Sequence, residues 1–494
     1  MTKPNIILIM TDQQRADTIH ALGYDHMITP ATDRLAETGI SFRNCFACGA
    51  TCIASRAAMF TGMYAHNTGV YTFNRWAHHR SWVYDLRDAG YHCVNIGKMH
   101  ISPRDEPMGF HERVIVENPT NWALRSTGVD DDWGRYLTLH GVDRPNARNF
   151  TDPEWLDKYQ GVPWHLDEHL HSDVFIGNSA LAWIHRYPTE RDQPVFLQIG
   201  FTGPHEPYDP LPRILDLYED KEMPAPVKRE GELEEKPPQH RAHQRYFRHT
   251  RGEAQIAMAE ATDEDIAEMR RHYYAKISTL DEKIGEILDA LEEKGYLDNA
   301  LLVFTSDHGD MVGDHQMAYK WLMYEPIVNI PLTIWDTRTG AQGVRDDLVS
   351  HIDIGPTVLE AAGIEIPSYL EGASLMGYVN GEGRDADAAV FCEDNYETMV
   401  RTSRYKLVHY AFQEDDGELY DLEQDPDELH NRFHDPHYGE VRAEMRAILR
   451  DWLARSTYRT AGYKNTQYEG PRLWPQESPY LMGGYRSNPK LRDA

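Results

Sequence analysis

Cysteine and long apolar runs are scarce in this sequence. Its 494 residues include five cysteines, Cys45, Cys48, Cys52, Cys93 and Cys392. So few, and an odd number, argue against a disulfide framework, and the first three lack the second pair that a structural zinc site needs. No stretch approaches a membrane span, and the apolar run at 6–10 is too short for a signal-peptide core. We therefore expect a cytoplasmic protein.

Positive charge is also in short supply. The chain has 50 Lys and Arg against 79 Asp and Glu, a formal net charge of -29. Such a field repels nucleic acid and anionic membrane surfaces, so we expect neither as a partner. An anionic substrate would need a local basic pocket. At 41% hydrophobic residues, the chain can bury a sizeable core.

What the sequence does have is a series of apolar runs that end in polar residues. The runs at 5–10, 91–97, 194–201 and 300–306 are typical of parallel strands buried on both faces. An amphipathic helix is expected at 277–295, with Gly295 as its stop. The alternation predicts an α/β fold: a large mixed, mostly parallel sheet sandwiched by helices. Ligands of such sheets bind beyond the carboxyl ends of the strands.

The residues that follow these runs could build a metal-assisted active site. Asp12 and Asp307 are the natural anionic metal ligands, and Gln13 and His308 could add an oxygen and an imidazole nitrogen. The cations that could hold a tetrahedral anion are Arg56, Lys98 and Lys320, and the candidate acid–base groups are His100 and His205. Taken singly, each cluster could instead be a helix cap, a surface loop or a turn. Four such polar clusters at the same edge of the sheet favour a shared active site over four unrelated caps, loops or turns.

Cys52 stands just before or within the first turn of an expected helix over 54–62. Helix N-termini attract anions and lower thiol pKa values, so we expect a reactive thiol. A thiolate nucleophile, a metal-bound thiolate, a modified side chain and a buried filler all remain open at this point.

The stretch Cys52-Ile53-Ala54-Ser55-Arg56, followed by Thr61-Gly62, resembles the sulfatase signature C-x-P-S-R-x-x-x-x-T-G. Further matches are TDQQRAD at 11–17, GKMH at 97–100, GPHEPY at 203–208, SDHGDMVGDHQMAYK at 306–320 and LYDLEQDPDELHN at 419–431. They cover nearly the whole chain in the family's order. The resemblance implies an alkaline phosphatase-like fold, nearest the subgroup of choline sulfatases, arylsulfatases and phosphonate monoester hydrolases.

The resemblance also implies a mechanism. A maturation enzyme would oxidise Cys52 to formylglycine, whose hydrate would attack sulfur or phosphorus while Asp307 accepts its proton. Arg56 and Lys98 would hold the diol and the substrate oxyanion, and His205 and Lys320 would bind the ester and stabilise the leaving alkoxide. His100 would then deprotonate the remaining hydroxyl, and sulfate would be eliminated. One divalent ion, Mn²⁺ or Ca²⁺, would bind Asp12, Gln13, Asp307, His308 and the diol at residue 52.

Three positions depart from the commonest sulfatase pattern. Ala54 stands at the position of a proline that the family's maturation enzymes read. Gln13 stands where many sulfatases have aspartate, and His308 where many have asparagine. The last two features resemble the phosphonate monoester hydrolase and choline sulfatase subgroup.

The domain organisation follows from composition. We expect a catalytic domain over 1–375, a small C-terminal α+β subdomain with an antiparallel sheet over 376–460, and an extended tail over 461–494. The tail is rich in Pro, Gly and aromatic residues. It either packs around a second subunit of a homo-oligomer or runs in extended form across the surface of its own chain.

Two segments are candidates for substrate specificity. Residues 206–265 are charged and proline-containing, as expected of an insertion at the mouth of the site or of a solvated loop. Between 117 and 150, Trp122, Trp133 and the acidic run 130–132 could cradle a cationic substrate such as a choline ester, unless the aromatic rings pack inside.

The leading interpretation is a sulfate ester hydrolase. Phosphonate or phosphate ester hydrolysis on the same residues is the nearest alternative. An inactive anion-binding relative and a metal-free thiol enzyme are alternatives of other classes.

Overall fold

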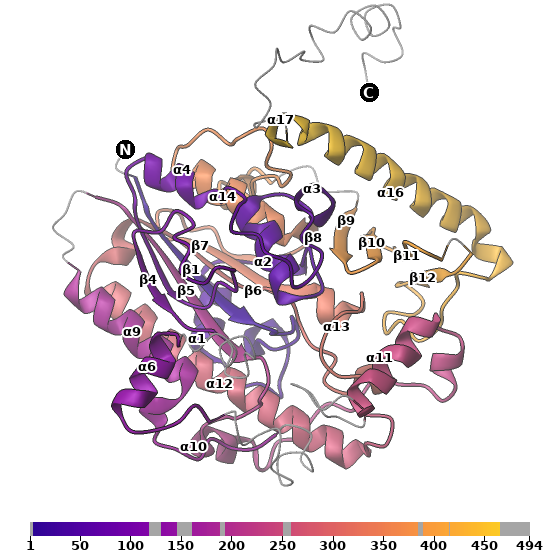
Figure 1. The fold of residues 1–494 in the computed structure, drawn as a ribbon, viewed down its shortest axis with the longest axis horizontal. Coiled ribbons are helices and arrows are strands. Elements are labelled where there is room, and N and C mark those ends of the chain that lie inside the picture. Colours follow the sequence, from indigo (N-terminus) through magenta and orange to yellow (C-terminus); the bar gives the residue numbers. More distant parts are fainter. Residues whose placement is uncertain are drawn as a thin grey trace, which may run out of the picture.

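The computed structural model describes residues 3–117, 130–145, 161–187, 193–249, 258–383, 389–413 and 415–464. Within these ranges no helix has the length and apolar character needed to cross a membrane. The described chain forms a large helix-covered sheet and a smaller sheet near the C-terminus (Figure 1).

The large sheet has eight strands in the order β4-β3-β5-β1-β6-β7-β2-β8. They are β1 Asn5–Asp12, β2 Ile40–Phe46, β3 His92–Gly97, β4 Glu112–Ile115, β5 Val195–Pro204, β6 Ala300–Ser306, β7 Asn329–Asp336 and β8 Gly343–Ser350. Only β7 runs antiparallel to its neighbours, β6 and β2. The predicted mixed, mostly parallel α/β sheet is confirmed.

Both faces of the central strand β1 are buried, because its side chains alternate between two cores. Ile7 and Ile9 pack with α12 (Asp263–Glu293), α9 (Ser172–Arg186) and α1 (Pro30–Thr38). Ile6, Leu8 and Met10 pack on the other face with α2 (Cys52–Thr61), α4 (Val83–Asp88) and α14 (Ile354–Ala361). Figure 1 shows these two groups of helices on opposite sides of the sheet. This explains why the strand is a continuous apolar run.

The helix expected at 277–295 is the second half of α12. The helix begins at Asp263, where Thr262 and Asp265 form a capping box. It ends at Glu293, and Gly295 follows in the left-handed conformation with φ 73°. The first half was missed because its many charged residues obscure the apolar stripe that includes Ile266 and Met269.

The smaller sheet has the strand order β12-β11-β10-β9. Its antiparallel strands are β9 Val390–Asp394, β10 Glu397–Arg401, β11 Tyr405–Tyr410 and β12 Gly417–Asp421. Helix α16 (Gly439–Arg459) packs on it through Met445, Leu449 and Trp452, with the Trp452 ring stacked 4.1 Å from Phe391. The predicted strands and helix are present, while the boundary at 375 stays a prediction.

Further α-helices of the described residues are α3 Ala65–Thr68, α6 Asp132–Leu139, α10 Pro212–Leu215, α11 Pro238–His249, α13 Glu325–Val328, α15 Met376–Val379 and α17 Ala461–Lys464. In α17, Lys464 donates to Asn67 of its own chain. Residues 465–494, most of the expected tail, lie outside the described part.

The described part of 206–265 has exposed stretches but also packs against other parts of the protein. Lys236 Nζ donates to the Tyr420 hydroxyl at 2.8 Å, and His240 lies 3.0 Å from Glu418, so the segment joins the small sheet. On the following turn of α11, His243 Nε2 lies 2.9 Å from the Lys320 carbonyl oxygen. The segment therefore reaches one of the predicted site residues.

Candidate active site

The carboxyl ends of β1, β5 and β6 bring three predicted site residues together. Parallel pairing aligns Asp12 with Pro204 and Thr11 with Ser306. Asp307 therefore follows directly beside Asp12, and the backbone N–H of His205 donates to the Asp12 carbonyl at 3.1 Å. Residues far apart in sequence thus meet at one edge of the sheet, as expected for an open α/β fold.

Cys52 is the first residue of α2 and is buried, with Thr51 as an extended N-cap. Its Sγ lies 3.1 Å from Lys320 Nζ, 3.2 Å from His308 Nε2 and 3.8 Å from Asp12 Oδ1. Burial and the charge of Asp12 raise the pKa of the Cys52 thiol to about 12. The expected low pKa at a helix N-terminus is therefore wrong: desolvation outweighs the helix dipole and the nearby lysine.

Asp12, Cys52, Asp307 and His308 each offer a ligand atom within 4.8 Å of the others. His308 Nδ1 lies 2.8 Å from the Gly309 carbonyl oxygen, to which it donates. Its Nε2 then carries the lone pair and faces the cluster, the arrangement that metal-binding histidines adopt. Two carboxylates, one imidazole nitrogen and the side chain at 52 form a donor set that fits a single divalent ion.

Two buried cations neutralise the carboxylates of this cluster. Arg56 donates from Nε to Asp307 at 2.7 Å and from Nη2 to Asp12 at 3.0 Å, and Lys98 Nζ pairs with Asp12. Burial alone would raise the pKa of Asp12, but Lys98 and Arg56 lower it to well below its usual value. Arg56 Nη1 donates to the Lys98 carbonyl at 3.0 Å, so all three guanidinium nitrogens contact protein oxygens. Arg56 thus holds the two carboxylates in place, and its predicted contact with a substrate anion stays a prediction.

The Gln13 amide is oriented by two acids that the sequence interpretation did not assign to the site. Its Nε2 donates to Asp310 Oδ2 at 2.5 Å and to Glu206 Oε2 at 3.0 Å. Its Oε1 consequently faces Lys320, whose Nζ donates to it at 2.7 Å. Asp310 also accepts from the Tyr208 hydroxyl at 2.5 Å. The signal was available, because Asp310, Glu206 and Tyr208 lie inside the matched motifs.

The two candidate acid–base histidines both lie beside these charges. Burial, then Lys320 for His205 and Lys98 for His100, lowers the pKa of each ring well below its usual value. His205 Nδ1 donates to the Glu206 carbonyl at 2.8 Å, which leaves the lone pair on Nε2. His100 adopts a left-handed φ of 60°, and among the described residues its buried Nδ1 has no hydrogen-bond partner.

Lys320 keeps its positive charge. Burial lowers its pKa, but Cys52, Glu206 and Asp12 raise it, and the net shift is upward. Its ammonium group, 3.1 Å from Cys52 Sγ, therefore places a positive charge beside that sulfur.

The proposed aromatic cradle for a cationic substrate is not present at Trp133. This ring is buried in the core, where its Nε1 donates to the Leu170 carbonyl at 2.9 Å. Asp131 caps α6 and pairs with Arg144 at 2.7 Å. The Asp131 carboxylate is thus used by partners within the protein rather than left for a cationic substrate. Trp122 lies outside the described residues.

Comparison with known proteins agrees with this architecture. The sulfatase family profile matches residues 4–364, and the profile described as N-sulphoglucosamine sulphohydrolase, C-terminal, matches 313–455. An arylsulfatase of Clostridium perfringens is 31% identical over 470 residues, which cover 90% of this chain and 94% of the relative. A choline-sulfatase of Rhizobium meliloti is 31% identical over 473 residues, covering 92% and 86%. The crystal structure of a phosphonate monoester hydrolase of Agrobacterium radiobacter superposes with a TM-score of 0.78 at 25% identity, covering 92% of this chain and 96% of that one.

Proposed function

This chain belongs to the sulfatase family, and from that premise we propose that it hydrolyses sulfate esters with a formylglycine made from Cys52 and one divalent metal ion. The observation that carries the proposal is the convergence on Cys52 of Asp12, from the first motif, and of His308 and Lys320, from the motif at 306–320. A buried thiol with a pKa near 12 is a poor nucleophile as it stands, which favours its modification over direct thiol catalysis.

The metal would be held by Asp12, Asp307 and His308 together with the oxidised side chain at 52. Gln13, also predicted as a ligand, would have to exchange the Lys320 hydrogen bond at its Oε1 for the ion. When bound, a divalent ion supplies Lewis-acid polarisation of the nucleophile and of a substrate oxygen. Carboxylates suit calcium, whereas the imidazole of His308 favours a transition metal, so we expect manganese to activate at least as well as calcium.

Formylglycine, once hydrated, supplies a hydroxyl nucleophile at the start of α2. Lys320, 3.1 Å from Cys52 Sγ, is placed to stabilise the anionic ester and the charge that develops on the leaving oxygen. His205 has its lone pair on Nε2 and would accept a hydrogen bond from a protonated group rather than donate one. His100, neutral and with a free ring nitrogen among the described residues, is suited to the role of base.

Phosphonate or phosphate ester hydrolysis is the second candidate. Neutral Gln13 and imidazole-bearing His308 leave the cluster one unit more positive than a site with aspartate at position 13. Such a site tolerates a more highly charged ester. The similarity to a phosphonate monoester hydrolase supports testing it.

The experiment combines mass spectrometry with matched substrates. The peptide that carries Cys52 should show one oxygen in place of sulfur and two hydrogens. The same preparation should hydrolyse 4-nitrophenyl sulfate, with 4-nitrophenyl phosphonate esters as the comparison. An active preparation whose Cys52 is wholly a thiol would refute formylglycine. Full modification, with metal present but no turnover of any ester, would favour an inactive anion-binding relative.

The remaining organisation is proposed from the sequence. Residues 1–375, 376–460 and 461–494 would be the catalytic domain, the C-terminal subdomain and a tail that joins subunits of a cytoplasmic homo-oligomer. Light scattering of the full chain and of a chain ending at residue 464 would test the tail. The tail has no such role if both form particles with the same number of subunits.

A further inference from the structure

The loop that carries Lys320, residues 311–321, has an unusual backbone. Five of the ten non-glycine residues with positive φ in the described chain lie in this loop, with φ between 42° and 75°. They are Val312, His315, Gln316, Tyr319 and Trp321. Because side chains other than glycine disfavour this region, the loop keeps its shape only where neighbouring groups hold it.

Asp310, which directly precedes the loop and is fully buried, holds the loop near both of its ends. Its Oδ1 accepts from the backbone N–H of Val312 at 3.0 Å and from that of Tyr319 at 2.8 Å. Tyr319 is the residue next to Lys320. One carboxylate oxygen therefore ties the beginning of the loop to the peptide that precedes Lys320.

The second oxygen of Asp310 reaches two other strand ends. Its Oδ2 accepts from Gln13 Nε2, beyond β1, and from the Tyr208 hydroxyl, beyond β5, both at 2.5 Å. Gln13 in turn accepts at Oε1 from Lys320 Nζ at 2.7 Å. Asp310 thus reaches Lys320 by two routes, through the backbone at Tyr319 and through the amide of Gln13.

A carboxylate is the group that suits position 310. Four donors converge on it, two backbone N–H groups, one amide and one hydroxyl. A carboxylate offers about four acceptor sites and no donor. An asparagine amide could still accept from the two backbone N–H groups, but its own N–H₂ would then face the donor of Gln13.

We propose that Asp310 is a positioning residue that sets where the Lys320 ammonium group stands relative to residue 52. In this structure Lys320 Nζ lies 3.1 Å from Cys52 Sγ. The inference rests on the proposed function for the role of that ammonium group, which is to stabilise the charge that develops on the leaving oxygen. Such stabilisation depends on placement, and an error of about 1 Å can cost about a hundredfold in rate.

The loop has further anchors that do not involve Asp310. Asp314 accepts from Arg15 at 2.7 Å and from Arg270 at 2.6 Å, and His315 pairs with Glu232. We therefore expect an Asp310 variant to fold with its loop displaced rather than to unfold.

The first test is structural and needs no turnover. In a crystal structure of Asp310→Ala, Lys320 Nζ should lie about 1 Å or more from its wild-type position relative to Cβ of residue 52. Asp310→Asn should disturb the contacts of Gln13 while retaining those of the Val312 and Tyr319 N–H groups. Lys320 Nζ in its wild-type place in Asp310→Ala would overturn the proposal.

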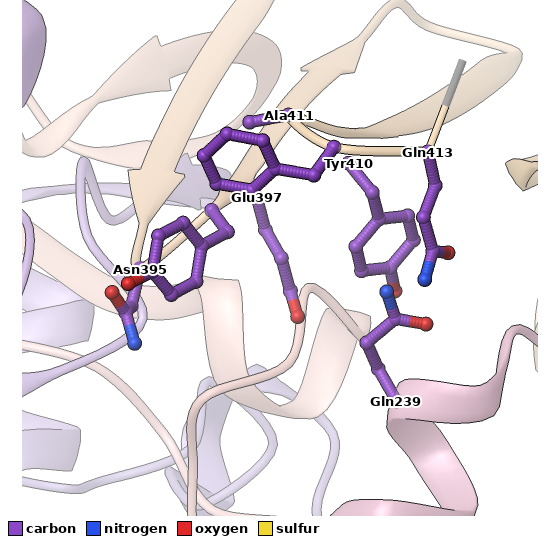
Figure 2. A pocket seen from close by; sticks show the side chains of 8 residues that line it. Gln239, Asn395, Glu397, Tyr410, Ala411 and Gln413 are labelled. Atoms are coloured by element: carbon purple, nitrogen blue, oxygen red, sulfur yellow. The ribbon is translucent and has the colours of Figure 1, made fainter.

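The matched control removes a buried acid elsewhere. Glu397 is 7% exposed and lines a cavity between the small sheet and α11. Figure 2 shows its side chain between Asn395 and Tyr410, with Gln239 approaching from α11. Glu397→Ala should leave Lys320 in place, and an equal displacement in this variant would contradict a specific role of Asp310.

The second test separates positioning from general damage. With 4-nitrophenyl sulfate, Asp310→Ala should lower kcat/KM by about a hundredfold. The loss should be larger with phenyl sulfate, whose leaving oxygen carries more charge and depends more on Lys320. Asp310→Asn should lie between wild type and Asp310→Ala, and Glu397→Ala should match wild type.

Equal losses in kcat/KM for all aryl sulfates would indicate general damage and overturn the positioning role. If the wild-type protein cleaves no ester at all, the proposed function fails. The crystallographic comparison of Asp310→Ala with wild type then decides by itself whether Asp310 positions Lys320.

Discussion

Two buried clusters of charge in this protein differ in how their partners are arranged. Around Cys52, Asp12, His308 and Lys320 point at one atom. A second cluster joins α11 and α13 to the small sheet and consists of Lys236, His240, Glu325, Lys406, Glu418 and Glu428. There the charges pair with one another: Lys406 lies 2.6 Å from Glu428 and 2.9 Å from Glu325, and His240 lies 3.0 Å from Glu418.

The comparison shows that burial of charge does not by itself mark a catalytic site. Both clusters are largely inaccessible to solvent, with Glu325 of the second cluster 21% exposed. The first lies where parallel strands end and directs ligand atoms at a common point, so it can hold something that is not protein. The second closes on itself and joins parts of the fold.

The largest expected effect is the loss of kcat when Cys52, at the centre of the first cluster, is replaced. Cys52→Ala should lower kcat by on the order of 10⁴-fold or more, because it removes the nucleophile, and Cys52→Ser should leave little activity. Steady-state assays with 4-nitrophenyl sulfate measure this. Cys93→Ala, at another buried thiol in β3, is the matched control and should retain kcat. Comparable losses in both variants would remove the special role of Cys52.

Metal removal should affect only the first cluster. Exhaustive chelation should abolish turnover, since the donors of Asp12, Asp307 and His308 would lack their ion. Readdition of manganese should restore activity at least as well as calcium. Metal content is measured alongside the rate. Equal activity before and after chelation would refute the metal, and full activity with calcium alone would refute only the preference.

Breaking the second cluster should cost stability rather than chemistry. Lys406→Met leaves Glu428 buried without its ion-pair partner and should cost about 3–5 kcal/mol of unfolding free energy, whereas Glu325 keeps Arg401 at 3.5 Å. Denaturant unfolding measures this cost. Turnover per folded molecule should stay close to wild type at a temperature where the variant is folded. A large fall in kcat would show that the second cluster takes part in the reaction.

A charge change at Gln13 should alter the substrate preference of the first cluster without abolishing activity. Gln13→Asp adds one negative charge and should shift the ratio of kcat/KM toward a sulfate ester over a phosphate ester by about tenfold, or about 1.4 kcal/mol. The variant loses the Nε2 bonds to Asp310 and Glu206, so metal occupancy must be equalised in both proteins. An unchanged ratio, or one shifted toward phosphate, would assign the preference to pocket shape.

The smallest effect is the pH response of the second cluster. Burial would raise the pKa of Glu418, but His240 and Lys236 lower it below its ordinary 4.5. The carboxylate therefore stabilises the fold above pH 4.5, and this contribution declines as the pH falls below that value. Between pH 5 and 4 the loss should be less than about 1 kcal/mol. Thermal unfolding should show a flatter pH profile in Glu418→Gln, and identical slopes would contradict the assignment.

The sequence by itself determined the architecture and most members of the candidate site. Apolar runs buried on both faces identify parallel strands, and Asp12 and Asp307 stand at their carboxyl ends. The start of the helix at Cys52 follows from the local pattern, and the order of the motifs indicates the family. These features depend on periodicity and spacing, which a linear chain displays directly.

Tertiary structure alone decided what surrounds each side chain. The thiol pKa of Cys52 depends on desolvation competing with nearby charges, and that balance exists only once the chain is folded. Asp310 and Glu206 orient Gln13 from two different strand ends, and Arg56 is occupied by the carboxylates it holds. The cavity at Glu397 combines α11 with the small sheet, which lies more than a hundred residues away in sequence. Burial and long-range pairing create these environments, and neither leaves a local pattern in the sequence.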